Sequence, residues 1–285
     1  MNDTCEKQRL QENTDRKRHW LRWGPYLAER QWATVREDYS ANGDCWNYFP
    51  HDHARSRAYR WGEDGLLGFT DSKCRLCVSL GLWNEKDSIL KERLFGLTNP
   101  EGNHGEDVKE QYFYLFSSPS HSYVKQLYKY PHAEFPYAKL VSENQKRTTK
   151  DREYELLDTG VFDEERYTDV VAEYAKEGPN DLLIQYTVTN RGPDPAPIHL
   201  VPQIWFRNNW TWQCTHEGCD VKPTIKKIDE QHLLLEHESL GKFLCVWEEN
   251  QEQFQEAIFT ENVTNDRRIL TLTFLRQATL QIPAR

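Results

Sequence analysis

The chain has 285 residues, with 45 acidic side chains against 36 basic ones, and therefore a net charge of −9. This negative charge argues against a nucleic-acid or anionic-lipid partner. No apolar run approaches the roughly 18 residues needed to cross a bilayer, and the N-terminus lacks the apolar core of a signal peptide. Seven cysteines without a regular framework indicate free thiols in a reducing compartment, so we expect a cytoplasmic protein with no membrane contact.

The first 65 residues fall into two parts. Residues 1–22 are almost wholly polar and predict an exposed helix or a frayed leader. Residues 23–65, here called the motif segment, hold four Trp, four Tyr, five Arg and seven carboxylates in 43 residues. Aromatic faces beside charged groups suit a sugar ring, but a buried ion-pair network beneath aromatic side chains has the same composition. Within it we predict a short helix at 27–35 and a turn at 42–44.

From residue 66 onward the pattern is typical of β-strands, because short runs rich in Val, Ile, Tyr, Phe and Thr alternate with turn residues. The clearest pair, 166–174 and 182–189, predicts a hairpin. Pro202 places strand 198–206 at an edge or a bulge. Residues 143–153 predict a solvated, flexible connector. The other candidate strands are 74–83, 111–116, 122–130, 154–158, 232–237 and 243–247. We therefore predict an all-β antiparallel sandwich of two sheets after a short helical or irregular N-terminal segment.

Two groups of side chains raise the question of a metal. Cys74 and Cys77 form a CxxC motif, and Cys214, His216 and Cys219 add further ligands, so a zinc site is conceivable. Side chains three positions apart in a strand point to opposite faces, however, and the second group lacks the paired spacing of a zinc knuckle. The i, i+2 histidines of residues 51–53 converge poorly on a helix, which favours hydrogen bonding. We predict neither a metal nor a cofactor.

Two further polar runs remain open in their interpretation. Residues 99–107 (NPEGNHGED) would form a calcium-like acidic loop, a loop docked on a neighbouring domain or a plain solvated turn. Residues 207–212 (RNNWTW) would pack at a sheet edge or form part of a sugar-facing rim.

Several long strings carry a resemblance to a known family. Residues 29–40 (ERQWATVREDYS) and 49–65 (FPHDHARSRAYRWGEDG) resemble the start of bacterial and fungal glucosidases of glycoside hydrolase family 63 and the mannosylglycerate-hydrolase-like group. The matching stretches continue at 90–109, 122–137, 155–162 and 201–212. The resemblance favours docking for the 99–107 loop. It ends near residue 265, so residues 266–285 look like a truncated or frame-shifted tail, and Ala33 stands where the family motif has Gly.

The resemblance implies a hydrolase that inverts alpha-linked glucosides in its complete form, with a carbohydrate substrate. It implies a β-supersandwich over 66–265, whereas the catalytic acid and base lie in an (α/α)6 barrel that has no counterpart in these 285 residues. No catalytic residue is therefore assigned, and the chain alone is expected to be inactive. The motif segment would face the barrel. The residues expected to bind substrate or support the pocket are Arg30, Trp32, Arg36, Glu37, Asp38, Tyr39, Arg60, Trp61, Glu63 and Asp64. A non-catalytic carbohydrate-binding sandwich and a structural docking sandwich are the alternatives.

Overall fold

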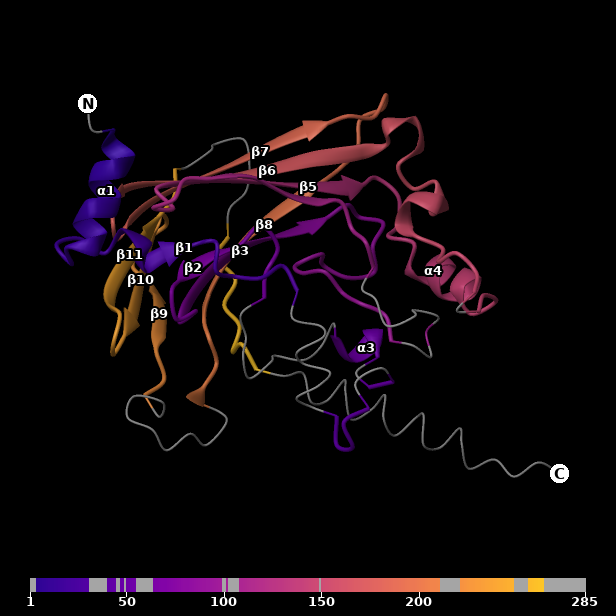
Figure 1. The fold of residues 1–285 in the computed structure, drawn as a ribbon, viewed down its shortest axis with the longest axis horizontal. Helices are drawn as coiled ribbons and strands as arrows, with labels where there is room; N and C mark the ends of the chain where they lie inside the picture. The colour runs from indigo at the N-terminus through magenta and orange to yellow at the C-terminus, as the bar shows by residue number, and fades with distance from the viewer. Residues whose placement is uncertain are drawn as a thin grey trace. The chain divides into compact units, whose positions relative to one another are not determined.

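The computed structural model describes residues 4–30, 40–44, 47–48, 50–54, 64–98, 101, 108–148, 150–210, 221–248 and 256–263. The chain divides into two compact units, unit 1 with residues 1–56 and 63–204 and unit 2 with residues 57–62 and 205–285. The predicted all-β class is confirmed, because the described strands form three sheets that are mostly antiparallel (Figure 1). The predicted boundaries at 22/23, 65/66 and 265/266 stay predictions.

Unit 1 contains two four-stranded sheets, with the orders β1-β2-β3-β8 and β4-β5-β6-β7. The first sheet is made of β1 (Trp23–Gly24), β2 (Phe69–Asp71), β3 (Leu76–Trp83) and β8 (His199–Phe206). The second is made of β4 (Tyr112–Ser117), β5 (Tyr123–Pro131), β6 (Tyr167–Gly178) and β7 (Asp181–Asn190). The helices of this unit are α1 (Cys5–Thr14), η1 (Trp20–Arg22), α3 (His51–Ala54), α4 (Tyr137–Asn144), η3 (Leu156–Thr159) and η4 (Asp163–Glu165). Among the described helices, none is long and apolar enough to span a membrane.

The two sheets of unit 1 bury one face of each against the other, as in a sandwich. Along β5 every second residue from Val124 to Tyr130 is buried, as expected for a strand with one face in the core. Tyr174 of β6 stacks on Phe69 of β2 with ring centroids 4.6 Å apart, and its hydroxyl donates to the carbonyl of Leu67 at 2.6 Å. Burial of such aromatic pairs stabilises the fold through apolar area removed from water.

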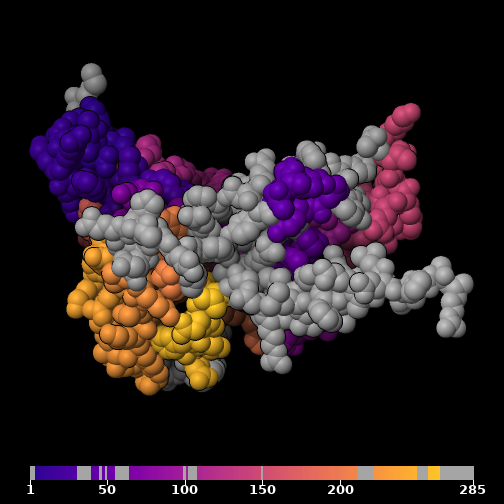
Figure 2. All heavy atoms as spheres, turned by 90° about the horizontal axis from the view of Figure 1, so that it is seen from below, coloured from indigo at the N-terminus to yellow at the C-terminus, as the bar shows by residue number. Residues whose placement is uncertain are grey.

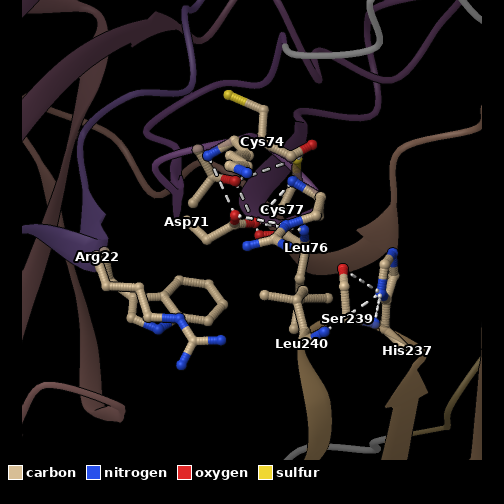
Figure 3. A network of polar contacts seen from close by, with 12 residues as sticks. Arg22, Asp71, Cys74, Leu76, Cys77, His237, Ser239 and Leu240 are labelled. Carbon is tan, nitrogen blue, oxygen red and sulfur yellow. Dashed lines mark hydrogen bonds and ion pairs between the residues drawn. The ribbon is translucent and has the colours of Figure 1, made fainter. Parts of the chain in front are cut away.

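Unit 2 contains the three-stranded sheet β11-β10-β9, made of β9 (Thr224–Lys227), β10 (His232–His237) and β11 (Gly241–Val246). Leu235 of β10 is 1% exposed. The turn from β10 to β11 is held by His237, whose Nδ1 lies 3.1 Å from the amide nitrogen of Ser239 (Figure 3). Gly241 follows with φ of +85°, which a residue with a Cβ rarely adopts.

Several local predictions are confirmed and others are wrong. The 166–174 and 182–189 hairpin is present as β6 and β7, and Pro202 lies in β8 at a sheet edge. Residues 154–158, predicted as a strand, instead lead into the helical turn η3, because the side chains of Glu155 and Asp158 each accept the other's backbone N–H in a capping box. Residues 27–30 are not helical. Asn144, at the start of the predicted flexible connector, is buried and bonds Tyr154 in both directions.

The α1 helix is attached to unit 1 by polar contacts, since it has no buried residue and lies uncovered in Figure 2 (indigo). The Glu6 carboxylate accepts from the Ser120 amide at 2.6 Å, the Ser120 hydroxyl at 2.8 Å and the Ser122 hydroxyl at 3.1 Å. Trp20, which follows the helix, donates its indole N–H to Glu12 at 2.8 Å. One carboxylate thus links the helix to the loop between β4 and β5.

This link is expected to weaken in acid. Partial burial raises the pKa of Glu6, but the bonds from Ser120 and Ser122 outweigh that effect and leave it below the ordinary value of 4.5. The contribution of Glu6 to stability is therefore fully present above pH 4.5 and is lost as the pH falls through the lowered pKa. Glu6→Ala should remove about 2 kcal/mol of protection from the α1 amides in hydrogen exchange at neutral pH. Gln11→Ala, on the exposed side of α1, is the control, and equal protection in both variants would contradict the link.

Candidate functional site

The structure describes two of the ten residues predicted to support a sugar pocket, Arg30 and Asp64. The other eight lie outside the described residues, and their roles stay predictions. These eight are Trp32, Arg36, Glu37, Asp38, Tyr39, Arg60, Trp61 and Glu63. The site is therefore described from residues 28–30 and 64–65 of the motif segment and from the residues that contact them.

The two ends of the motif segment lie side by side. Ala28 and Asp64 form a parallel β-bridge, and the Gly65 amide donates to the Ala28 carbonyl at 2.8 Å. The Leu94 amide donates to the Glu29 carbonyl at 2.9 Å, which adds residues 92–94 to the same group. Glu29, the neighbour of Arg30, and Asp64 are thereby brought to the same place in unit 1 although they are far apart in the sequence.

A third point of the motif segment is also attached to unit 1. The amide of His51, the first residue of α3, donates to the Glu101 carboxylate at 3.2 Å, and its Nδ1 lies 3.1 Å from the Gly96 carbonyl oxygen. The His51 ring packs on Tyr137 with centroids 4.1 Å apart. The histidine predicted to form hydrogen bonds does so, and the segment is fixed at its middle as well as at its ends.

Asp64 is held by an arginine that the sequence reasoning did not single out. Its side chain is 5% exposed, and Arg93 Nη1 lies 3.4 Å from each carboxylate oxygen. Burial raises the pKa of Asp64, and the Arg93 guanidinium opposes this shift. Arg93 also pairs with Glu92 at 3.3 Å. Arg93 lies within residues 90–109, one of the stretches that carry the family resemblance, and this position is the sequence feature that could have pointed to it.

From Glu92 the contacts continue to the first sheet. Gln203 of β8 donates to Glu92 at 3.0 Å and accepts from Ser79 of β3 at 3.1 Å. The series Asp64, Arg93, Glu92, Gln203 and Ser79 therefore connects the end of the motif segment to two strands. Such a continuous series holds its charged groups in one arrangement.

Glu29 and Arg30 lie beside tyrosines of β4. The Tyr114 hydroxyl donates to Glu29 at 2.7 Å, and Tyr112 packs 5.3 Å from Tyr114 between ring centroids. Burial, with a smaller effect of the Glu29 carboxylate, raises the pKa of Tyr114 well above its ordinary value, while Arg30 opposes this shift. Because Arg30 is exposed and Tyr114 is 53% exposed, this part of the site meets solvent and offers an aromatic face beside charges.

Below the surface lies a buried ion pair enclosed by aromatic rings. Lys91 Nζ is 3.0 Å from both oxygens of Glu110, and their side chains are 2% and 0% exposed. The Tyr128 hydroxyl also donates to Glu110 at 2.5 Å, and Lys91 donates to the Tyr137 hydroxyl at 2.7 Å. The ammonium lies 3.8 Å from the centroid of Phe135. This pair lies outside the motif segment, so the two interpretations of that segment's composition stay open.

Burial acts on both members of this pair. It raises the pKa of Glu110 and lowers the pKa of Lys91, and in each case the charge of the partner opposes the shift. Both residues were missed from the sequence, because nothing in a string of charges shows which ones are buried.

The carboxylates described at this site are engaged by protein groups. Glu29 accepts from Tyr114, Asp64 and Glu92 pair with Arg93, and Glu110 is held by Lys91 and Tyr128. Hydrolysis of a glycosidic bond requires an acid and a base on either side of the scissile bond, with room for a water in an inverting enzyme. Each described carboxylate is bonded to a side chain of this chain, and the supporting role of Arg30 and Asp64 stays a prediction.

The structure describes some of the residues that the sequence offered as metal ligands. Among the described residues, no group of three or more His, Cys, Asp or Glu side chains is placed to hold a metal. Cys74 lies in the turn before β3 rather than in a strand as predicted, with φ of +48°, and its thiol lies 3.8 Å from the Tyr26 carbonyl oxygen. Cys214, His216 and Cys219 lie outside the described residues, and so does most of the 99–107 loop.

The comparisons with known proteins give one strong similarity. The chain is 46% identical over 260 residues to a Saccharomyces cerevisiae protein described as "Uncharacterized protein YMR196W", and the match covers 87% of this chain and 24% of the yeast protein. The chain thus spans about a quarter of the length of that relative. No family model matches the chain. No solved structure matches it either.

Proposed function

We propose that the chain is the N-terminal portion of a cytoplasmic glucosidase resembling glycoside hydrolase family 63, which hydrolyses alpha-linked glucosides with inversion in its complete form. Its substrate is a carbohydrate, and its partner is an (α/α)6 catalytic domain. The chain itself supplies no catalytic acid or base. One observation carries this proposal: Glu29, Asp64, Glu92 and Glu110 are all engaged by neighbouring protein groups, an arrangement that favours a supporting role over proton transfer.

Two further observations support it. The match with the yeast relative leaves most of that protein's length outside the aligned region, which provides room there for a further domain. The edge strand β4 presents Phe113, Tyr114, Leu115 and Phe116, which are 39–54% exposed. A contiguous exposed apolar group is typical of a surface that contacts another domain or a ligand.

The test is hydrolysis of a panel of alpha-glucosides and mannosylglycerate, with the product anomer followed by NMR. We expect no turnover by this chain alone, and turnover with inversion by the full-length yeast relative. Turnover by the chain alone would overturn the assignment of both catalytic groups to another domain. A full-length relative without glycosidase activity would overturn the family proposal.

A chimera of the yeast relative carrying this chain in place of its matching region tests the supporting role. Arg93→Ala is expected to lower kcat/KM roughly tenfold, because Asp64 loses the group that positions it. Arg152→Ala is the matched control, since that side chain is 77% exposed. Equal activity of the two variants would contradict the proposal for Asp64.

The exposed aromatics of β4 also favour a second candidate, a non-catalytic sandwich that binds carbohydrate through a flat surface. That protein would bind glucans as the isolated chain, and Phe116→Ala would weaken the binding. Calorimetry with soluble glucans separates the two candidates, because a purely supporting or docking sandwich shows no heat of binding without its catalytic domain.

A further inference from the structure

The four outer strands of the two sheets in unit 1 differ in how well they are protected from pairing with another chain. Outer strands expose unpaired backbone groups and are usually kept short, bulged, charged or interrupted by proline. β1 has two residues, β8 contains Pro202, and the register of β4 shifts between Tyr114 and Phe116. Each of these three strands therefore has a feature that limits pairing along its outer side.

β7 has none of these features along its central part. It is ten residues long, and residues 182–189 (LLIQYTVT) contain no charged residue and no proline. Its apolar side chains are partly in solvent, with Leu183 62% and Ile184 40% exposed. Among the described strands β7 pairs with β6 only, and it is the outermost strand of its sheet in Figure 1.

The backbone shows which residues of β7 point toward the outer side. The amide of Arg191, which directly follows β7, donates to the carbonyl of Tyr167, the first residue of β6, at 3.0 Å. Because hydrogen-bonded positions alternate along an antiparallel pair, the odd-numbered residues of β7 direct their backbone groups toward β6. Even-numbered residues, such as Ile184 and Val188, direct theirs away from β6. An added antiparallel strand would bond to these even-numbered positions.

The charges at the two ends of β7 favour a second copy of this chain as the strand that pairs with its outer side. Asp181 begins the strand, and Arg191 follows its last residue. The Arg191 side chain is half exposed and its Nε already donates to Asp169 of β6 at 2.7 Å, so a carboxylate of a second copy would pair with the terminal nitrogens of the guanidinium. If a second copy pairs antiparallel about a two-fold axis through residue 186, Asp181 of each copy lies opposite Arg191 of the other, and Ile184 lies opposite Val188. The two pairs of Asp181 with Arg191 lie on the same face of the joined sheet. The backbone hydrogen bonds between the two copies are made by even-numbered residues of both, which are the residues whose backbone groups point away from β6.

We propose that the outer side of β7 is a homodimer interface, in which two copies join their β4-β5-β6-β7 sheets into one eight-stranded sheet. The interface is isologous, so one self-complementary strand serves both copies. Main-chain hydrogen bonds and the apolar pair of Ile184 with Val188 supply affinity, and the Asp181 and Arg191 pairs set the register.

Sedimentation velocity of the purified chain across the micromolar range tests the proposal. We expect a monomer–dimer equilibrium that weakens with salt. Asp181→Lys should raise the dimer Kd roughly tenfold, because it places like charges opposite each other twice. Glu177→Lys makes the same change of charge near the end of β6, where the register with β7 shifts, outside the proposed pairing, and should leave Kd unchanged.

Two further variants keep the test decisive. Ile184→Pro removes an outward-pointing N–H without removing a bond to β6, so it should abolish dimers while far-UV circular dichroism stays unchanged. Mixing the Asp181→Lys and Arg191→Glu chains should restore dimers, since each end of the mixed pair again joins opposite charges. A chain that is monomeric at all concentrations, or dimers that survive Ile184→Pro, would overturn the proposal. Failure of the mixed pair to form dimers would overturn the register.

Discussion

Lys91→Met is expected to lower the free energy of unfolding by about 3–5 kcal/mol, because it leaves the Glu110 carboxylate without its cation in a site closed to water. The Tyr128 hydroxyl remains as a donor, but one neutral donor does not replace an ammonium that contacts both carboxylate oxygens. Urea unfolding at neutral pH, followed by tryptophan fluorescence, measures the effect. Lys86→Met makes the same change at an exposed lysine of the same segment and should cost less than about 0.5 kcal/mol.

The pH dependence of this variant gives a second check. Without Lys91, burial raises the pKa of Glu110 further above the ordinary value, because only the Tyr128 hydroxyl and the charge of Arg30 still oppose it. The folded variant then holds a proton that the unfolded chain releases, so its stability falls as the pH rises above about 4.3 and is highest in mild acid. Lys91→Met combined with Glu110→Leu should regain most of the loss, since no buried charge remains. A double variant as unstable as the single one would contradict the uncompensated charge as the cause.

Asp71→Ala is expected to cost about 3 kcal/mol, because one buried carboxylate organises the turn between β2 and β3. Asp71 is 0% exposed and accepts from the amides of Lys73 at 3.1 Å, Arg75 at 2.7 Å and Leu76 at 3.0 Å. The Arg75 guanidinium adds a fourth bond at 3.1 Å. Removing the carboxylate leaves three amide donors without this acceptor.

The size of the Asp71 effect is checked by denaturant unfolding of three variants. Asp71→Asn should cost less than Asp71→Ala, because its amide oxygen still accepts from part of the turn, although it loses the charge that pairs with Arg75. Lys73→Ala removes an exposed side chain from the same turn and should change stability by less than about 0.5 kcal/mol. If Asp71→Ala changed the free energy of unfolding no more than Lys73→Ala does, the carboxylate would not be what stabilises the turn.

The strands that the sequence predicted well are those whose local pattern is unambiguous. Residues 232–237 form β10 with the same bounds, and the turn-flanked run 182–189 lies within β7. Leu156 and Leu157 have the apolar character of a strand, but the cap made by Glu155 and Asp158 turns the backbone into a short helix. The α4 helix was missed, since its eight residues (YAKLVSEN) are too few to show a helical repeat of apolar positions, although Leu140 lies in the core.

The candidate site was only partly predictable for a different reason. Asp64 could be selected because it lies in a dense motif, and its partner Arg93 lies 29 residues further on. Lys91 and Glu110 are likewise joined across 19 residues by the packing of the sandwich. A sequence with 36 basic and 45 acidic residues allows very many such pairs, and only burial distinguishes the ones that matter.

The bridge between Ala28 and Asp64 has a thermodynamic consequence for chain length. The bridge and the bond from the Leu94 amide to the Glu29 carbonyl hold both ends of residues 29–63 at one place in unit 1. Doubling the length of a closed loop costs only about 0.6 kcal/mol, so residues inserted between these ends, away from the contacts of His51, should change the free energy of unfolding little. The cost of closing this loop is then set mainly by the bridge and only weakly by the number of residues that it encloses.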